Sequence, residues 1–254
     1  MNNANSLWAQ CRWPDLASPY AEALREAVCF ILHHVEDVQG IIVSGTILRG
    51  NPAPSSDLDI YVIRQKPQRQ RIQKFFNGVP AEIFINPAEK VREYFEQEHK
   101  AARPITAHML TTGFTILSLS PVLDDVRQQA QDFLARQPTP GAQELTAMRY
   151  MVAARYEDAI DVATECPETT NMILDLAVYS MLQYRFRQAN RHVPRDKDLL
   201  LALETLDPDL ACLAREFYNA PALSTRLTLA EQIADRTIET HGFFEWETAP
   251  EDVV

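Results

Sequence analysis

The chain has 254 residues, a formal net charge of −11 and 46% hydrophobic residues, so it is long enough for one large globular domain or two smaller ones. Its acidity disfavours proteins that bind nucleic acid backbones non-specifically, because those usually carry a basic surplus. The apolar runs are far shorter than the roughly 20 residues that cross a bilayer. The four cysteines form no C-x-x-C pair, which is typical of reduced thiols. We therefore expect a cytoplasmic protein with no membrane partner and no extended nucleic acid partner.

Helix and strand signals alternate in the first half of the chain, and helical signals dominate the second half. Apolar spacing predicts a helix over 19–39, and short apolar runs predict strands over 41–43, 57–63, 81–86 and 113–117. From about residue 122 onward the spacing is helical, with breaks at prolines. The predicted helices of this half cover 123–136, 143–164, 170–190, 195–205, 208–219 and 222–240. We expect an α/β core with a small mixed sheet over 1–121 and an all-α helical bundle over 122–254.

The charge is unevenly divided between these halves. Residues 1–124 contain 12 basic and 13 acidic residues, whereas residues 125–254 contain 12 basic and 22 acidic residues. Such an asymmetry suggests two units with different tasks.

Three acidic residues on two predicted strands are the candidate catalytic and metal-binding residues. Asp57 and Asp59 are two positions apart on one strand, so their side chains share a face of the sheet. Glu82 lies on the next predicted strand. Neighbouring carboxylates repel each other unless a cation lies between them, and Mg²⁺ accepts one or two carboxylates together with substrate phosphates. A D-x-D pair alone is more often an exposed strand with its acids in water.

The segment before these acids favours a phosphate site. Gly45 and Thr46 follow the strand at 41–43, so backbone N–H groups and a hydroxyl are available to phosphate oxygens. Arg49 can add a charge-assisted hydrogen bond, and Ser56 adds a second hydroxyl. We therefore predict that Gly45, Thr46, Arg49 and Ser56 bind phosphate oxygens.

Together these residues resemble a known signature. The order Val43-Ser44-Gly45-Thr46, a spacer, Asp57-Leu58-Asp59 and then Glu82 is similar to the polymerase-β-like nucleotidyltransferase superfamily. The stretch GTILRGNPAPSSDLDIYV resembles its minimal and aminoglycoside nucleotidyltransferase branch. The match covers roughly residues 40–86, and Thr46 stands where the family most often has Ser. The resemblance implies an α/β nucleotidyltransferase core.

The second half resembles the helical domain of streptomycin and spectinomycin adenylyltransferases. The similarity lies in the stretch from His192 to Leu200 and in Leu206-Asp207-Pro208. In that setting a basic residue of the helical domain reaches the nucleotide phosphates across a cleft, and Arg195 and Lys197 are the candidates. The alternative is an ordinary exposed helix start.

The resemblance implies a transferase that uses Mg²⁺, with two ions expected at Asp57, Asp59 and Glu82. It implies transfer of a nucleoside monophosphate, AMP from ATP, to a hydroxyl group, with Glu82 as metal ligand or general base. A small cationic acceptor such as an aminoglycoside-like antibiotic would suit the acidic second half. Asp158, Asp161 and Asp175 are its candidate ligands. Two alternatives remain: an antitoxin-like enzyme that modifies or sequesters a partner protein, and a toxin-like enzyme that acts on tRNA.

Two further patterns each allow more than one interpretation. The stretch from Arg64 to Lys74 contains five basic and no acidic residues, and is either a small anion or nucleic-acid patch or an exposed loop and helix near the catalytic edge. Arg187 and His192 have the Arg-x4-His spacing of HEPN ribonucleases, a short pattern that often arises by chance.

Overall fold

The computed structural model describes residues 2–50, 52–53, 55–248 and 250. The chain divides into two compact units, Met1–Arg136 and Gln137–Val254, each with its own hydrophobic core.

The first unit contains a mixed five-stranded sheet in the order β3-β4-β2-β1-β5. β2 and β4 are parallel neighbours, and the other neighbouring pairs are antiparallel. A small mixed sheet is what we predicted. The strands are β1 (Val38–Ser44), β2 (Leu58–Arg64), β3 (Gln70–Phe76), β4 (Val79–Pro87) and β5 (Phe114–Ser118).

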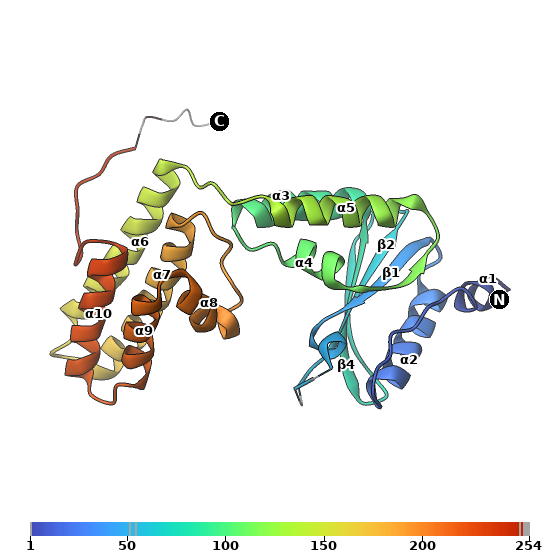
Figure 1. Ribbon diagram of the computed structural model, residues 1–254, viewed down its shortest axis with the longest axis horizontal. Helices are drawn as coiled ribbons and strands as arrows, with labels where there is room; N and C mark the ends of the chain where they lie inside the picture. Colours follow the sequence, from blue (N-terminus) through green and yellow to red (C-terminus); the bar gives the residue numbers. More distant parts are fainter. Residues whose placement is uncertain (1, 51, 54, 249, 251–254) are drawn as a thin grey trace. The chain divides into compact units, whose positions relative to one another are not determined.

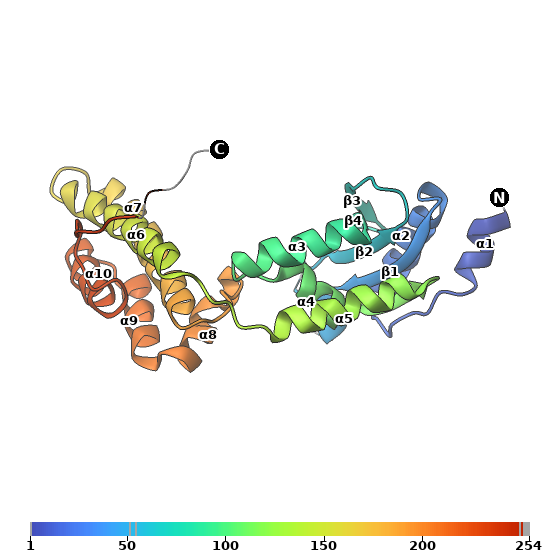
Figure 2. The ribbon, with the colours of Figure 1, turned by 90° about the horizontal axis from the view of Figure 1, so that it is seen from above.

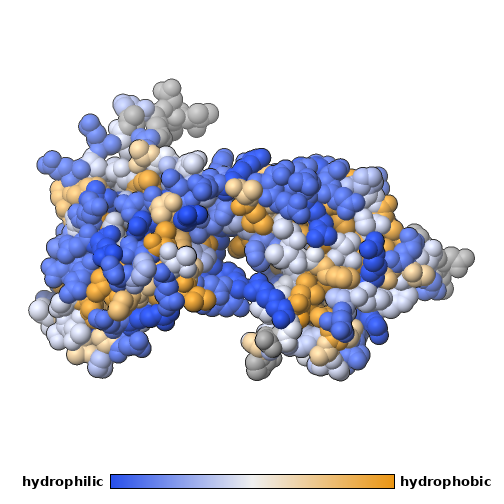
Figure 3. Space-filling model, viewed as in Figure 1, coloured by the Kyte–Doolittle hydropathy of each residue, from blue (hydrophilic) through white to orange (hydrophobic). Residues whose placement is uncertain are grey.

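Helices cover both faces of the sheet (Figures 1 and 2). One face, which includes Ile41 and Ile60, packs against α2 (Tyr20–His34), and α1 (Asn2–Trp8) lies against α2. The opposite face, which includes Ile42 and Tyr61, packs against three helices. Those helices are α3 (Ala88–Lys100), α4 (Ile105–Thr112) and α5 (Pro121–Ala135). The outer surface over α3 and α5 is mostly hydrophilic in Figure 3, as expected for helices with one buried face.

The structure corrects two predicted elements of the first unit. Residues 70–76 form an edge strand, whereas we expected loop and helix between Ile60 and Ala81. Asn77 and Gly78, with φ angles of 45° and 76°, join β3 to β4 in the kind of turn that hairpins favour. The helix predicted over 19–39 ends at His34, because Val38 and Gly40 pair with β2 in the sheet.

The boundary between the units also differs from the prediction. We placed it after residue 121, which assigns α5 to the second domain. In the structure α5 belongs to the first unit, because Leu123, Val126 and Ala130 are buried against α3 and α4.

The second unit is all-helical among its described residues, as predicted. α6 and α7 form an antiparallel pair, α10 packs against α7 and α9, and α8 packs against α9. No helix in the described part of the chain is long and apolar enough to cross a membrane. The elements are α6 (Ala142–Asp161), α7 (Pro167–Gln188), η2 (Asp196–Asp198), α8 (Leu199–Leu206), α9 (Pro208–Asn219) and α10 (Leu223–Thr237).

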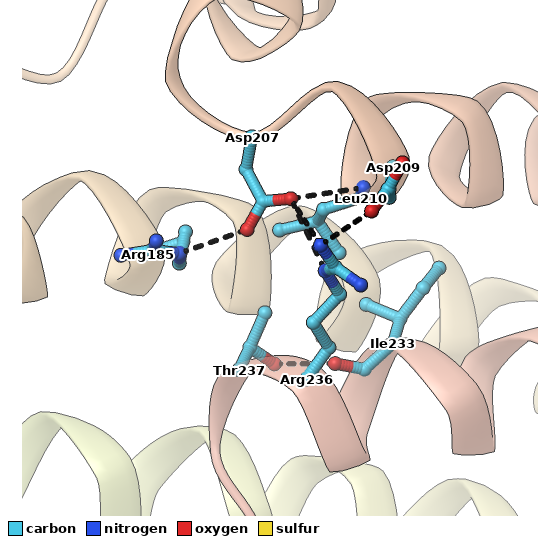
Figure 4. Close-up of polar contacts among 7 residues, drawn as sticks. All are labelled: Arg185, Asp207, Asp209, Leu210, Ile233, Arg236 and Thr237. Atoms are coloured by element: carbon cyan, nitrogen blue, oxygen red, sulfur yellow. Dashed lines mark hydrogen bonds and ion pairs between the residues drawn. The ribbon is translucent and has the colours of Figure 1, made fainter.

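Asp207 connects three helices of the second unit (Figure 4). One carboxylate oxygen caps α9 by accepting the Leu210 N–H at 3.2 Å, and also accepts from Arg236 of α10 at 2.9 Å. The other oxygen accepts from Arg185 of α7 at 3.3 Å. Burial alone would raise the pKa of Asp207, but the hydrogen bonds from Arg236, Leu210 and Arg185 together outweigh it and lower the pKa.

We expect Asp207→Asn to destabilise the second unit by about 1–3 kcal/mol, because charge-assisted bonds to two arginines are weakened. The charged form of Asp207 stabilises the fold above the ordinary carboxyl pKa, and this stabilisation is lost as the pH falls through the lowered folded pKa. Urea unfolding across acidic pH measures both effects. Asp209→Asn, which removes one exposed partner of Arg236, should change stability by less than about 0.5 kcal/mol. An equal loss in both variants would contradict this role of Asp207.

Gly113 lies where α4 passes close to β1. A Cβ at this position would lie 2.3 Å from the Ile42 side chain and 2.9 Å from the Val43 carbonyl oxygen. We expect Gly113→Ala to cost about 1–3 kcal/mol in urea unfolding, as overpacking does. Gly141→Ala is the matched control, since Gly141 has an ordinary φ of −66° and no described atom lies within 4 Å of the added carbon. Unchanged stability of Gly113→Ala would contradict the close approach.

Candidate active site

Four polar residues form a row across one face of the sheet. Each residue of the row is the register partner of the next: Ser44 of β1, Asp59 of β2, Glu82 of β4 and Gln73 of β3. Register partners lie on the same face of a sheet. In the neighbouring row on this face, Ile42 and Tyr61 are buried under the helices, whereas Asp59 and Glu82 are partly exposed. The row therefore lies at the edge of the helical cover, where a ligand can approach.

A glycine turn lies beside Asp59. Gly45 has φ 107° and ψ −179°, a region that is essentially restricted to glycine. A Cβ on Gly45 would lie 3.2 Å from a carboxylate oxygen of Asp59, so the turn approaches this carboxylate closely. The next residue, Thr46, begins a short 3-10 helix that ends at Arg49, whose side chain is exposed.

The turn is tied to the segment that carries Asp57. The hydroxyls of Thr46 and Ser56 lie 2.9 Å apart, in hydrogen-bond contact, and Asp57 follows Ser56 directly before β2. The structure thus brings Gly45, Thr46, Ser56 and Asp57, candidates from two separate stretches of sequence, to one end of β2.

The donors at this end of β2 suit a divalent cation. Asp57 and Asp59 supply two carboxylates, the number with which Mg²⁺ is usually bound alongside substrate phosphates. The Ser44 hydroxyl is 3% exposed and has no hydrogen-bond partner among the described residues, so the site contains an unsatisfied polar group. Among those residues no three Asp, Glu, His or Cys side chains are grouped closely enough to hold a metal ion. Asp57 and Asp59 offer donors of the kind that Mg²⁺ takes, and among the described residues Glu82 does not complete a three-residue group with them.

Glu82 is bonded to β3 instead. One of its carboxylate oxygens accepts from Arg71 at 2.6 Å, and the other accepts from the Gln73 amide. The guanidinium of Arg71 also lies over the Phe84 ring, 4.8 Å from its centre. In the sequence, Arg71 stands out only as one residue of a basic stretch, and no pattern singles out Gln73.

A half-buried carboxylate of α3 binds the start of α4 on this face of the sheet. Glu98 of α3 accepts from the backbone N–H and the hydroxyl of Thr106, both at 2.7 Å, and so satisfies the start of α4. Burial raises the pKa of Glu98, against the lowering effect of these hydrogen bonds. Tyr61, the neighbour of Asp59 on the same face, accepts a hydrogen bond from Asn86, and burial raises its pKa. These hydrogen bonds connect α3 to α4 and β2 to β4 on this face of the sheet.

The candidates of the second unit do not form one cluster. Asp158 and Asp161 are exposed near the end of α6, whereas Asp175 of α7 is paired with Arg226 of α10. Arg195 is paired with Asp198 at 2.6 Å. Lys197 is exposed in η2.

Arg187 of the Arg-x4-His pattern has a structural partner. Its side chain is 4% exposed and ion-paired with Glu144 of α6. This contact joins α6 to the end of α7, so a structural role explains Arg187 and no catalytic role is needed.

Comparison with known proteins supports the fold. No family model matches the chain, and no curated protein matches its sequence. The chain is similar to the crystal structure of a nucleotidyltransferase-like protein from Exiguobacterium sibiricum 255-15, with a TM-score of 0.53 and 14% identity. The similarity covers 80% of this chain and 69% of that chain. The predicted fold class, a nucleotidyltransferase-like α/β core followed by a helical domain, is therefore confirmed.

We expect Gly45→Ala to destabilise the first unit by about 1–3 kcal/mol, because alanine disfavours this backbone region and its Cβ would press on Asp59. Gly50→Ala is the control. Gly50 also has a positive φ, 83°, but no described atom lies within 4 Å of an added Cβ. The free energy of unfolding of Gly50→Ala should fall by only about 1 kcal/mol, the cost of a positive φ for alanine. Urea unfolding compares the two, and an equal loss would show that Asp59 does not constrain the turn.

Proposed function

We propose that the protein is a magnesium-dependent nucleotidyltransferase that transfers a nucleoside monophosphate, AMP from ATP, to a hydroxyl group of a small acceptor. The observation that carries this proposal is the position of Asp57 and Asp59 beside the Gly45 turn, with Glu82 on the parallel neighbour strand. The nucleotidyltransferase-like fold supports it.

Each residue near the turn has a role in this proposal. Asp57 and Asp59 would hold Mg²⁺, which when bound neutralises the negative charge of the triphosphate. Backbone N–H groups at Gly45 and the hydroxyls of Thr46 and Ser56 bind phosphate oxygens. Arg49 is exposed and adds positive charge beside them.

The reaction forms one bond and breaks one bond. The acceptor oxygen bonds to the α-phosphorus, and the bond from the α-phosphorus to the oxygen bridging to the β-phosphate breaks. Pyrophosphate leaves with the electron pair. Glu82 takes the proton of the acceptor hydroxyl, general-base help worth roughly 10²–10⁴-fold.

For the acceptor we propose a small cation such as an aminoglycoside-like compound. The excess of acidic residues in the second half of the chain supports this choice. Asp158 and Asp161 remain proposed ligands because they are exposed. Asp175 is a weaker candidate, because Arg226 already compensates its charge. Lys197 is the better of the two proposed phosphate ligands from this unit, because Arg195 is paired with Asp198.

We expect Asp57→Asn and Asp59→Asn each to lower transfer by about a hundredfold or more, because several kcal/mol of charge stabilisation is lost. Purified protein is incubated with labelled ATP, GTP, CTP and UTP, and with aminoglycosides, total tRNA or cell extract. Asp125→Asn, an exposed acid of α5, is the control with unchanged transfer.

The position of the label distinguishes the candidate functions. Label on an aminoglycoside supports the proposal, whereas label only on protein or on tRNA supports one of the two alternatives. Wild-type turnover in either aspartate variant would overturn the metal assignment. No label with any substrate would overturn the transferase itself.

A further inference from the structure

Both carboxylate oxygens of Glu82 are engaged by the edge strand β3. Arg71 donates to one oxygen at 2.6 Å and Gln73 donates to the other. The side chain of Glu82 is 23% exposed, so little water competes for these contacts. Gln73 is its direct cross-strand partner, and Arg71 is two positions along the same face. The contact therefore follows from the register of the hairpin.

Both oxygens of Glu82 are thus engaged on the side of β4 away from β2 and Asp59. The two residues are register partners on neighbouring strands, so their backbones already place them side by side. A cation at Asp59 that also used Glu82 would lie close to the positive guanidinium of Arg71, and like charges repel each other. Glu82 can therefore serve the cation or the acceptor fully only after Arg71 has moved away from it.

Arg71 can exchange Glu82 for another negatively charged partner. Its side chain is 58% exposed, and its stacking on Phe84 leaves other N–H donors of the guanidinium available. An open surface depression is lined by Arg71 and Gln73. β3 is about 10 Å from β2, since neighbouring strands are about 4.8 Å apart. A nucleoside triphosphate bound near Asp59 can span this distance.

We propose that Arg71 and Gln73 form a latch on Glu82 that the phosphates of the nucleotide open. A phosphate group offers the planar guanidinium the same two-oxygen geometry as a carboxylate, with more negative charge. Arg71 then binds the nucleotide, and Glu82 is released toward Asp59. This inference rests on the proposed function and names a nucleotide-binding and positioning residue for it.

The latch predicts opposite effects of one substitution on two ligands. Arg71→Met removes the guanidinium, so the affinity for the tightest-binding of ATP, GTP, CTP and UTP should fall roughly tenfold to a hundredfold. The same change releases Glu82, so Mn²⁺, used in place of Mg²⁺, should bind several-fold more tightly without nucleotide. Calorimetry measures the nucleotide, and electron paramagnetic resonance measures free Mn²⁺, both on the full chain.

Three further variants test the same latch. Arg71→Lys keeps the charge without the planar fork and should lose less nucleotide affinity than Arg71→Met. Adding Glu82→Gln to Arg71→Met should abolish the gain in Mn²⁺ affinity. Lys74→Met is the matched control, because Lys74 is a cation of the same strand that lies over Phe30 and Phe76 on the opposite face. It should change neither affinity.

The outcomes separate the latch from the proposed function. If the wild-type chain binds a triphosphate but Arg71→Met changes only one of the two affinities, or neither, the latch is wrong and the proposed function stands. If the wild-type chain binds no triphosphate, the proposed function is wrong and the latch fails with it.

Discussion

β2 and β4 run parallel, side by side, although β3 lies between them in the chain. Parallel neighbours need a long connection, and here that connection contains the edge strand and its hairpin turn rather than a helix. The pairing places Glu82 beside Asp59, and the hairpin places Arg71 and Gln73 beside Glu82. The two hydrogen bonds of the Glu82 carboxylate depend on this arrangement.

The helices α3, α4 and α5 divide the same face of the sheet into two parts. Over Tyr61 and Ile63 the face is closed and apolar, with its polar groups bonded to one another. Each fully buried aliphatic side chain there contributes about 1.5–3 kcal/mol. Two residues before Tyr61, at Asp59, the cover ends and the face holds acids. Buried core residues and the acids of the candidate site thus lie on consecutive rows of one sheet face.

Much of this arrangement is present in local sequence patterns. Period-two alternation predicted the face of Asp59, and proline positions predicted the helices of the second unit closely. The edge strand was missed because Arg71 and Lys74 resemble an exposed basic loop, although Asn77-Gly78 between two apolar runs is a hairpin signal. The pairing of Glu82 with Arg71 depends on rotamers that no sequence pattern encodes. The unit boundary was missed because α5 packs on distant α3.

The turn at Asn77 and Gly78 also bears on how the length of the chain can vary. Surface turns usually tolerate insertions and deletions. Here a single added or deleted residue that shifts β3 by one position would turn Gln73 to the opposite face and bring Ile72 or Lys74 beside Glu82. A change by two residues would preserve the face. Although the turn is exposed, we therefore expect it to accept register-shifting insertions or deletions only in even numbers of residues.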